Sequence, residues 1–218
     1  MVRVTFEAPE DFAETPVGMT EEEVRKHVAA RLRGGADGAR APSAETLSEV
    51  RAHSQRLRES GTLYCGSFLG AVDAEPSLAT LTVNVVEFPC GDDPRLATEG
   101  MAQALSAARG PLWAGSLYEL PCGQPACVLT GPVVHRSPEA GPDAAEVAYA
   151  KLQAFVPVPL SRASGEQLLL VVDFSSPSPG HWDRYMEIPA RLLRSLSFAE
   201  TETETSTETS TETEREGP

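Results

Sequence analysis

The sequence is poor in aromatic residues and in positive charge, and it has no long apolar run. Phe, Trp and Tyr make up 6% of the 218 residues, and 18 Lys and Arg residues stand against 32 Asp and Glu, which gives a formal net charge of −14. Nucleic acids and anionic membranes are disfavoured as partners, because an acidic surface repels their phosphate groups. No stretch approaches the roughly eighteen apolar residues of a membrane-spanning helix, so membrane insertion is not expected.

The sequence also lacks a recognisable secretory signal and is sparing with cysteine. Residues 1–16 show no basic segment followed by an apolar one. The four cysteines are Cys65, Cys90, Cys122 and Cys127. Without a secretory signal they are predicted to be thiols of a reducing compartment rather than a disulfide framework. These features predict a cytoplasmic protein.

The compact motifs of common enzymes are missing as well. There is no G-x-S-x-G turn for a nucleophilic serine, no G-x-x-x-x-G-K-[ST] loop and no G-x-G-x-x-G after a strand. The four histidines do not have the spacing of a zinc site; they are His27, His53, His135 and His181. No catalytic residue, cofactor or metal site is predicted, and the chain is not expected to be an enzyme.

Two helices are predicted within the first sixty residues. Thr20 and Glu23 have the spacing of a capping box, in which each side chain satisfies a free backbone N–H group at the start of a helix. One face of this first helix carries an apolar stripe of Val24, Val28 and Leu32. A second helix is predicted over residues 43–60. Together they define an N-terminal extension, residues 1–60, that packs on the following domain or on a partner.

Residues 61–198 show the pattern of one α+β domain. Apolar alternation or apolar runs predict six strands, at 62–72, 77–88, 116–122, 125–134, 146–159 and 167–176. Asp93 and Pro94 begin a long amphipathic helix between the second and third strands. Short turns between the strands favour hairpins, and therefore an antiparallel sheet. The last strand is apolar enough to be central and buried on both faces.

The chain ends in an amphipathic helix and an acidic tail. Pro189 falls inside the helix and is expected to kink it or to split it in two, because proline has no N–H group and its ring clashes with the preceding turn. The tail, residues 199–218, is rich in Thr and Glu and has no apolar core residues, so it is predicted to be disordered. It is either a solubilising terminus or a docking segment for a basic partner, open to phosphorylation.

Three phrases in the second half of the chain carry a resemblance to known proteins. They are LPCGQPA at 120–126, FSSP at 174–177, and a helix led by Trp182 that closes on SLSF at 195–198. They resemble actinobacterial proteins of the Mog/PsbP/LpqN-like fold over residues 60–198. The resemblance implies a PsbP-like α/β/α sandwich, with an antiparallel sheet of six or seven strands flanked by helices. It also implies a non-enzymatic accessory or assembly role, linked in some members to secretion or envelope machinery.

Cys122 and Cys127 flank the turn of a predicted hairpin. If they face each other across the two strands, their Cα atoms lie about 4.5 Å apart, which is within the range of a disulfide. They are therefore a candidate redox pair, or half of a metal site completed by Cys90 or His135. The C-x4-C spacing is looser than a zinc knuckle, and two inert thiols are the favoured alternative.

His181 and Trp182 stand where the last strand gives way to the last helix. A catalytic histidine needs a nucleophile and an orienting carboxylate within hydrogen-bond reach. Asp183 is close in sequence, but residues so close together on a helix do not face each other. The favoured interpretation is that His181 faces solvent in the first turn and that Trp182 anchors the helix on the sheet.

The sequence as a whole predicts a non-enzymatic, protein-binding accessory or assembly factor in a bacterial cytoplasm. Its expected partner is another protein or a second copy of the chain. The candidate interface consists of Val24, Val28, Leu32 and Trp182. Two alternatives stay open: a structural subunit of a larger phage-like or secretion particle, and a small redox or hydrolytic enzyme that uses Cys122 and Cys127 or His181.

Overall fold

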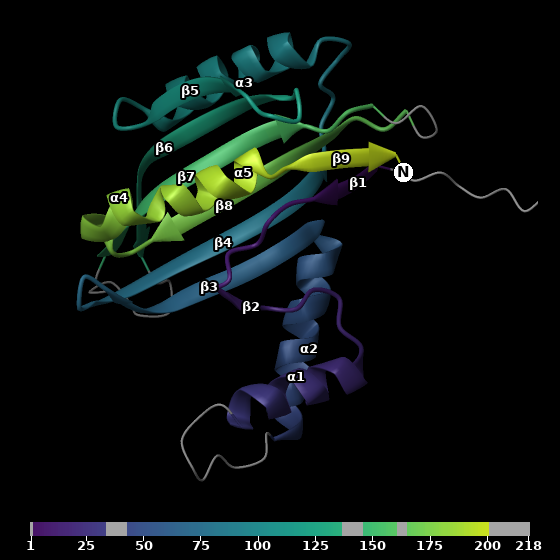
Figure 1. Ribbon diagram of the computed structural model, residues 1–218, viewed down its shortest axis with the longest axis vertical. Coiled ribbons are helices and arrows are strands. Elements are labelled where there is room, and N and C mark those ends of the chain that lie inside the picture. Colours follow the sequence, from purple (N-terminus) through teal and green to yellow (C-terminus); the bar gives the residue numbers. More distant parts are fainter. Residues whose placement is uncertain (1, 34–42, 137–145, 161–164, 201–218) are drawn as a thin grey trace, which may run out of the picture.

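The computed structural model describes residues 2–33, 43–136, 146–160 and 165–200. Over these residues the chain forms a seven-stranded antiparallel sheet, a second sheet of two strands, and helices on both sides of the larger sheet (Figure 1). The predicted α+β class with an antiparallel sheet is confirmed. None of the helices in the described ranges is long and apolar enough to cross a membrane.

The larger sheet has its most apolar strand at the centre. In spatial order its strands are β2 (Ala13–Glu14), β3 (Thr62–Val72), β4 (Glu75–Glu87), β8 (Leu168–Ser176), β7 (Glu146–Pro157), β6 (Pro125–Arg136) and β5 (Ala114–Glu119). The central position predicted for the last long strand is therefore correct. Leu170, Val172 and Phe174 are fully buried on one face of β8, whereas Val171 and Asp173 on the other face are only half-buried.

The core lies between this buried face and the C-terminal helices. These are the short helix η2 (Pro179–His181), α4 (Trp182–Tyr185) and α5 (Glu187–Arg194), which lie across the sheet in Figure 1. Leu192 and Leu196 join the same apolar cluster as Leu81 and Val172. The helix is interrupted at Met186, which confirms the break expected from Pro189. A proline has no N–H group to donate within a helix, and its ring clashes with the carbonyl group four residues earlier.

Helix α3 (Pro94–Arg109) packs on the other face, against β5 and β6. The Asp93 carboxylate accepts hydrogen bonds from the N–H groups of Arg95 (2.9 Å) and Leu96 (3.2 Å), which confirms the predicted cap. Gly115 of β5 lies directly beneath Ser106 of α3, so a side chain at position 115 would collide with the helix. The sheet is thus covered by helices from both sides, although α3 reaches only part of its face.

Residues 2–14 belong to the sheet domain, in contrast to the predicted boundary at residue 60. Strand β1 (Val2–Thr5) pairs with β9 (Ser197–Glu200), and β2 pairs with β3. Phe12 is buried in the core, with ring centroids 6.0 Å from Phe68 and 6.3 Å from Phe174. The short strands escaped prediction because their partners lie far away in the sequence. The tail begins later than predicted, since β9 includes Ala199, and residues 201–218 lie outside the described ranges.

The two N-terminal helices form an arm that projects from the β2–β3 edge of the sheet (Figure 1). We use the word arm for α1 (Glu21–Arg33) and α2 (Ala44–Glu59) together. The predicted capping box is formed, with the Thr20 N–H group donating to the Glu23 carboxylate over 2.8 Å. The N–H groups of Gly18 and Met19 donate to the carbonyl and hydroxyl of Ser54, which fixes the base of the arm.

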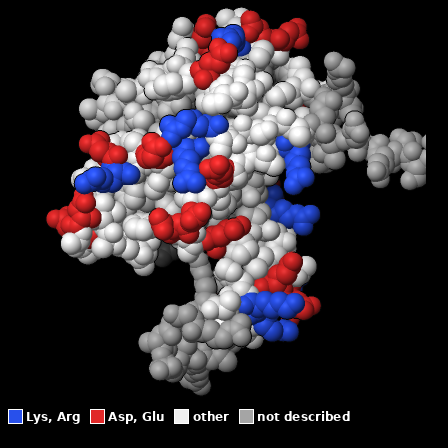
Figure 2. Space-filling model, viewed as in Figure 1, with Lys and Arg blue, Asp and Glu red and all other residues white. Residues whose placement is uncertain are grey.

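The surface seen in Figure 2 mixes both signs of charge. Over α4 and α5, three arginines pair with carboxylates: Arg184 with Asp73, Arg191 with Glu7, and Arg194 with Glu187. On α1, Arg25 and Lys26 pair with glutamates one turn earlier. Such exposed pairs contribute little to stability, because water screens both charges, and their main effect is to intersperse the charges of an acidic chain.

Candidate functional site

A cluster of polar side chains lies where the β3–β4 hairpin meets α4. The hairpin turns through Asp73 and Ala74, whose φ angles of 50° and 70° are those of a two-residue turn of type I′. Three residues after Ala74, Ser77 points toward the core, in the same alternation as Ala79 and Leu81. Its exposed fraction is 3%, so its hydroxyl needs partners inside the protein.

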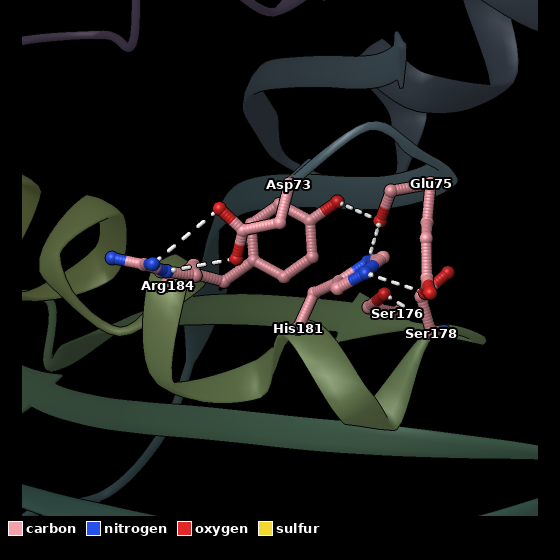
Figure 3. Close-up of polar contacts among 8 residues, drawn as sticks. Asp73, Glu75, Ser176, Ser178, His181 and Arg184 are labelled. Carbon is pink, nitrogen blue, oxygen red and sulfur yellow. Dashed lines mark hydrogen bonds and ion pairs between the residues drawn. The ribbon is translucent and has the colours of Figure 1, made fainter. Parts of the chain in front are cut away.

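Those partners come from the C-terminal helices (Figure 3). The Ser77 hydroxyl lies 2.8 Å from Nδ1 of His181 and makes a short hydrogen bond with the Tyr185 hydroxyl. On the other side of the ring, Nε2 of His181 lies 3.5 Å from the Glu75 carboxylate. We call these four residues the Ser77 cluster. Three of them are buried, and only Glu75 is exposed.

One placement of the protons satisfies every group in the cluster. Tyr185 donates to Ser77, Ser77 donates to Nδ1 of His181, and the remaining N–H group at Nε2 faces the Glu75 carboxylate. A serine, a histidine and a carboxylate in sequence are the residue types of a hydrolytic relay. The prediction that His181 faces solvent is wrong: the residue is 9% exposed and turns inward because Ser77 offers it a buried partner.

The surroundings of the cluster favour a structural role over catalysis. A nucleophilic serine must be reachable by its substrate, whereas the Ser77 hydroxyl is closed in and already bonded to Tyr185. A cavity of about 480 Å³ has Phe68, Tyr185 and Arg184 among its lining residues, but neither Ser77 nor His181. The cluster therefore acts as a latch that holds α4 against the β3–β4 hairpin.

Two further sets of contacts support this latch at its ends. Arg184 of α4 forms an ion pair with Asp73 of the turn, at 3.1 Å. Below the cluster, the Ser176 hydroxyl donates to the Leu78 carbonyl over 2.6 Å and accepts from the Ser178 N–H group over 3.0 Å. Figure 3 shows the Arg184–Asp73 pair on one side of His181 and the contact between Ser176 and Ser178 on the other. The hairpin, the end of β8 and the start of α4 are thus joined by side chains.

Sequence reasoning did not find Ser77, which is 104 residues from His181. One local signal was available. The residues that follow it at every second position, Ala79, Leu81 and Val83, are apolar and face the core, so Ser77 is a polar residue at an inward position of the strand. That pattern indicates a buried hydroxyl that needs a partner, but it does not say which partner.

Trp182 lies on the core as an anchor, with its ring centroid 5.8 Å from that of Phe174. It remains half-buried rather than fully enclosed. Its free side borders a shallow depression of about 390 Å³, which Leu112 and Pro132 also line. Part of the tryptophan therefore stays available at the surface.

Cys122 and Cys127 do not form the candidate redox pair. Cys127 stands opposite Leu117 in the β5–β6 ladder, whereas Cys122 lies in the turn, which is formed by residues 120–124. The two positions are therefore not cross-strand neighbours, and all four cysteines are free thiols. Burial raises the pKa of Cys127, Cys65 and Cys90, which keeps these thiols protonated and slow to react. Among the described residues, no three His, Cys, Asp or Glu side chains are placed to hold a metal ion.

The predicted interface on α1 is split by the fold. Val24 is fully buried, whereas Val28 is half-buried and lines a groove of about 750 Å³ between α1 and α2. The side chain of Leu32 lies outside the described part of the chain. Val50 lines the same groove, and His27, His53 and Arg56 border it. His135, the remaining histidine, packs edge-on against Tyr149.

Comparison with known proteins shows a distant likeness among solved structures. No protein-family model and no curated protein matches the chain. Among solved structures, the fold is similar to that of LpqN, which is described as involved in cell envelope biogenesis of Mycobacterium tuberculosis. The two share 12% sequence identity over 92% of this chain and 85% of the other, with a TM-score of 0.46. A likeness this distant carries no argument about the family or the function of this chain.

Proposed function

We propose that this protein is a non-enzymatic, protein-binding accessory or assembly factor, and that the arm is its binding element. The observation that carries the proposal is the groove between α1 and α2, which holds Val28 and Val50 at a distance from the main core. The latch role of the Ser77 cluster supports the non-enzymatic part of the proposal, because the cluster's reactive groups are closed in and mutually bonded.

The groove suits one chemical kind of partner, an amphipathic helix. Two helices side by side offer a trough into which the apolar side chains of a third helix fit. The rim adds a charge preference, since Arg56 and His53 border the groove against the single carboxylate of Glu49. The proposed partner is therefore a helix with apolar residues on one side and carboxylates flanking them.

The architecture of the arm fits this use. The segment before α1 is tied to α2 by a few hydrogen bonds, among them that from the Gln55 amide to the Met19 carbonyl (3.0 Å) and those to Ser54. α1 and α2 are held together by the buried Val24 and by the Arg51–Glu21 ion pair at 3.6 Å. The arm is thus a small unit whose buried Val24 lies outside the main core cluster.

The test is quantitative affinity capture from the native cell lysate with the full chain as bait. Two groove variants are compared with wild type: Val28→Asp, which places a carboxylate in the apolar trough, and Arg56→Glu, which reverses an exposed charge on its rim. The matched control is Leu69→Asp on β3, at a position that is 84% exposed and outside the arm.

The expected result is a stoichiometric protein whose recovery falls at least tenfold with both groove variants and stays unchanged with the control. Circular dichroism and melting temperature confirm that each variant keeps the fold of the sheet domain. Recovery that is equal for wild type and both groove variants would overturn the arm as the binding element. The absence of any stoichiometric partner would overturn the proposed function itself.

A further inference from the structure

The outer edge of β5 is a full-length strand edge that no described residue covers. β5 is the last strand of the seven-stranded sheet, and all six of its residues are exposed. Its register with β6 is regular from Ala114 to Glu119, without a bulge. At the opposite edge, β2 has only two residues and the chain beyond it is tied to β3 by the bond from the Thr15 N–H group to the Cys65 carbonyl.

The sequence of β5, AGSLYE, has none of the devices that keep a strand edge from pairing. Proteins protect such edges with lysine, proline, bulges or inward charges, because unpaired N–H and C=O groups attract another strand. The single charge of β5 is Glu119, and Arg95 of α3 already neutralises it at 2.7 Å. An open and regular edge whose one charge is already paired is typical of a strand that has a partner.

The backbone shows which groups are available. The N–H group of Leu120 donates to Gln124, across the hairpin, so the peptide groups of Leu120 point toward β6. Peptide groups alternate in direction along a strand, and those of Gly115, Leu117 and Glu119 consequently point outward. A partner strand must satisfy the N–H and C=O groups of these three residues.

We propose that this partner is the β5 strand of a second copy of the chain, paired antiparallel about a twofold axis at Leu117. In this register Leu117 faces its own symmetry mate, and Gly115 faces Glu119 of the other copy. It is the one antiparallel self-pairing that matches all three outward-pointing residues with each other. The inference goes beyond the proposed function and does not depend on the arm.

The side chains fit the same register. Leu117 is 49% exposed, and across the axis it meets an identical leucine, which removes apolar surface from water on both copies. On the other face of the sheet, the exposed Tyr118 lies opposite Ser116 of the second copy, so no two bulky side chains compete for one place. Glu119 faces glycine rather than a second carboxylate, so like charges are not set directly opposite. The result is a dimer with one continuous sheet.

The net charge of the chain predicts how dimerisation depends on salt concentration. Each chain carries a formal net charge of −14, so two copies repel each other at low ionic strength, and salt screens that repulsion. Sedimentation velocity of the full chain up to about 100 μM is expected to show a monomer–dimer equilibrium that strengthens as salt is raised. A contact dominated by pairs of opposite charge would weaken instead.

Charge variants at the axis provide the decisive test. Leu117→Lys and Leu117→Glu each place two like charges face to face and are expected to weaken dimerisation at least tenfold. Mixing the two variants restores association as a heterodimer, because opposite charges then meet across the axis. Leu69→Lys on β3 is the control and leaves the dimer intact. A protein that is monomeric at every concentration and salt level would overturn the proposal, and so would a dimer that survives Leu117→Lys.

Discussion

At the scale of single residues, Tyr64 has a buried hydroxyl group whose pKa is raised. Its exposed fraction is 5%, and its hydroxyl has no hydrogen-bond partner among the described residues. The ring lies over Gly66, where any larger residue would collide with the hydroxyl. Burial, aided by the nearby carboxylate of Glu14, raises the pKa of Tyr64 to about 12, because the charged phenolate is disfavoured away from water.

Tyr64→Phe is expected to change the response of the protein to alkaline pH. In the unfolded chain a tyrosine ionises near pH 10, below the folded pKa of about 12. The stabilising contribution of the neutral phenol is therefore complete below about pH 10 and is lost as the pH rises from about 10 to 12. The variant lacks this loss, and at neutral pH its stability equals or exceeds that of wild type, since an unpaired buried hydroxyl disappears.

Urea unfolding at a series of pH values measures this effect. The exposed Tyr118 supplies the control variant, Tyr118→Phe. If Tyr64→Phe and wild type lost stability in parallel between pH 10 and pH 12, the buried phenol would not be the group responsible.

At the scale of elements, the Ser77 cluster joins parts of the chain that form independently. β4 follows its hairpin turn, and α4 begins after the bend at residues 177–178, so neither element dictates the position of the other. The hydroxyl of Ser77 connects them by accepting and donating one hydrogen bond each. The stability of this junction rests on a few buried polar contacts as well as on the apolar packing of Tyr185 against Phe174, whose ring centroids lie 5.6 Å apart.

Ser77→Ala is expected to lower the free energy of unfolding by about 2–3 kcal/mol, because it leaves both the Tyr185 hydroxyl and Nδ1 of His181 buried without a partner. Tyr185→Phe should cost less, about 1 kcal/mol, since Ser77 keeps His181. The control is Thr80→Ala, which removes an exposed hydrogen bond to Ser175 and changes stability by no more than about 0.5 kcal/mol.

Denaturant unfolding ranks the three variants. A cost for Ser77→Ala no larger than that of Thr80→Ala would contradict the latch. An assay with small activated esters addresses the hydrolytic alternative directly: turnover by wild type that vanishes in a well-folded Ser77→Ala protein would assign catalysis to the cluster.

At the scale of the whole molecule, the first and last described strands pair with each other and complete the fold. β1 and β9 pair in register from Val2 with Glu200 to Thr5 with Ser197. Val2, Val4 and Phe198 pack on the core from this small sheet. A chain that ends at Leu196 therefore loses more than its last strand, because β1 loses its partner as well.

Two truncations separate the last strand from the acidic tail. A chain that ends at Glu200 is expected to keep the melting temperature of the full protein, since residues 201–218 contribute no apolar side chain to a core. A chain that ends at Leu196 loses the burial of Phe198 and the pairing of β1, on the order of 2 kcal/mol or more, and melts several degrees lower. Calorimetry compares the two, and equal melting temperatures would contradict a stabilising role for β9.

Local sequence patterns were sufficient to predict those features that depend on interactions between residues close together in the chain. The capping box at Thr20, the cap at Asp93 and the break caused by Pro189 depend on contacts within a few residues, so they could be predicted from the sequence. The central place of β8 followed from its apolar composition. Only part of the candidate site could be predicted in this way. The sequence singled out His181, but it did not predict that His181 is buried or that Ser77 is its partner.

The sequence by itself determined the α+β class, the antiparallel sheet and the starts of the helices, because hydrophobic periodicity and backbone capping act over short distances. Only the tertiary structure decided that Ser77 meets His181, that β1 pairs with β9, and that Cys127 faces Leu117 rather than Cys122. Those outcomes depend on strand register and on contacts between distant segments, which many local patterns allow and only the packing of the whole chain selects.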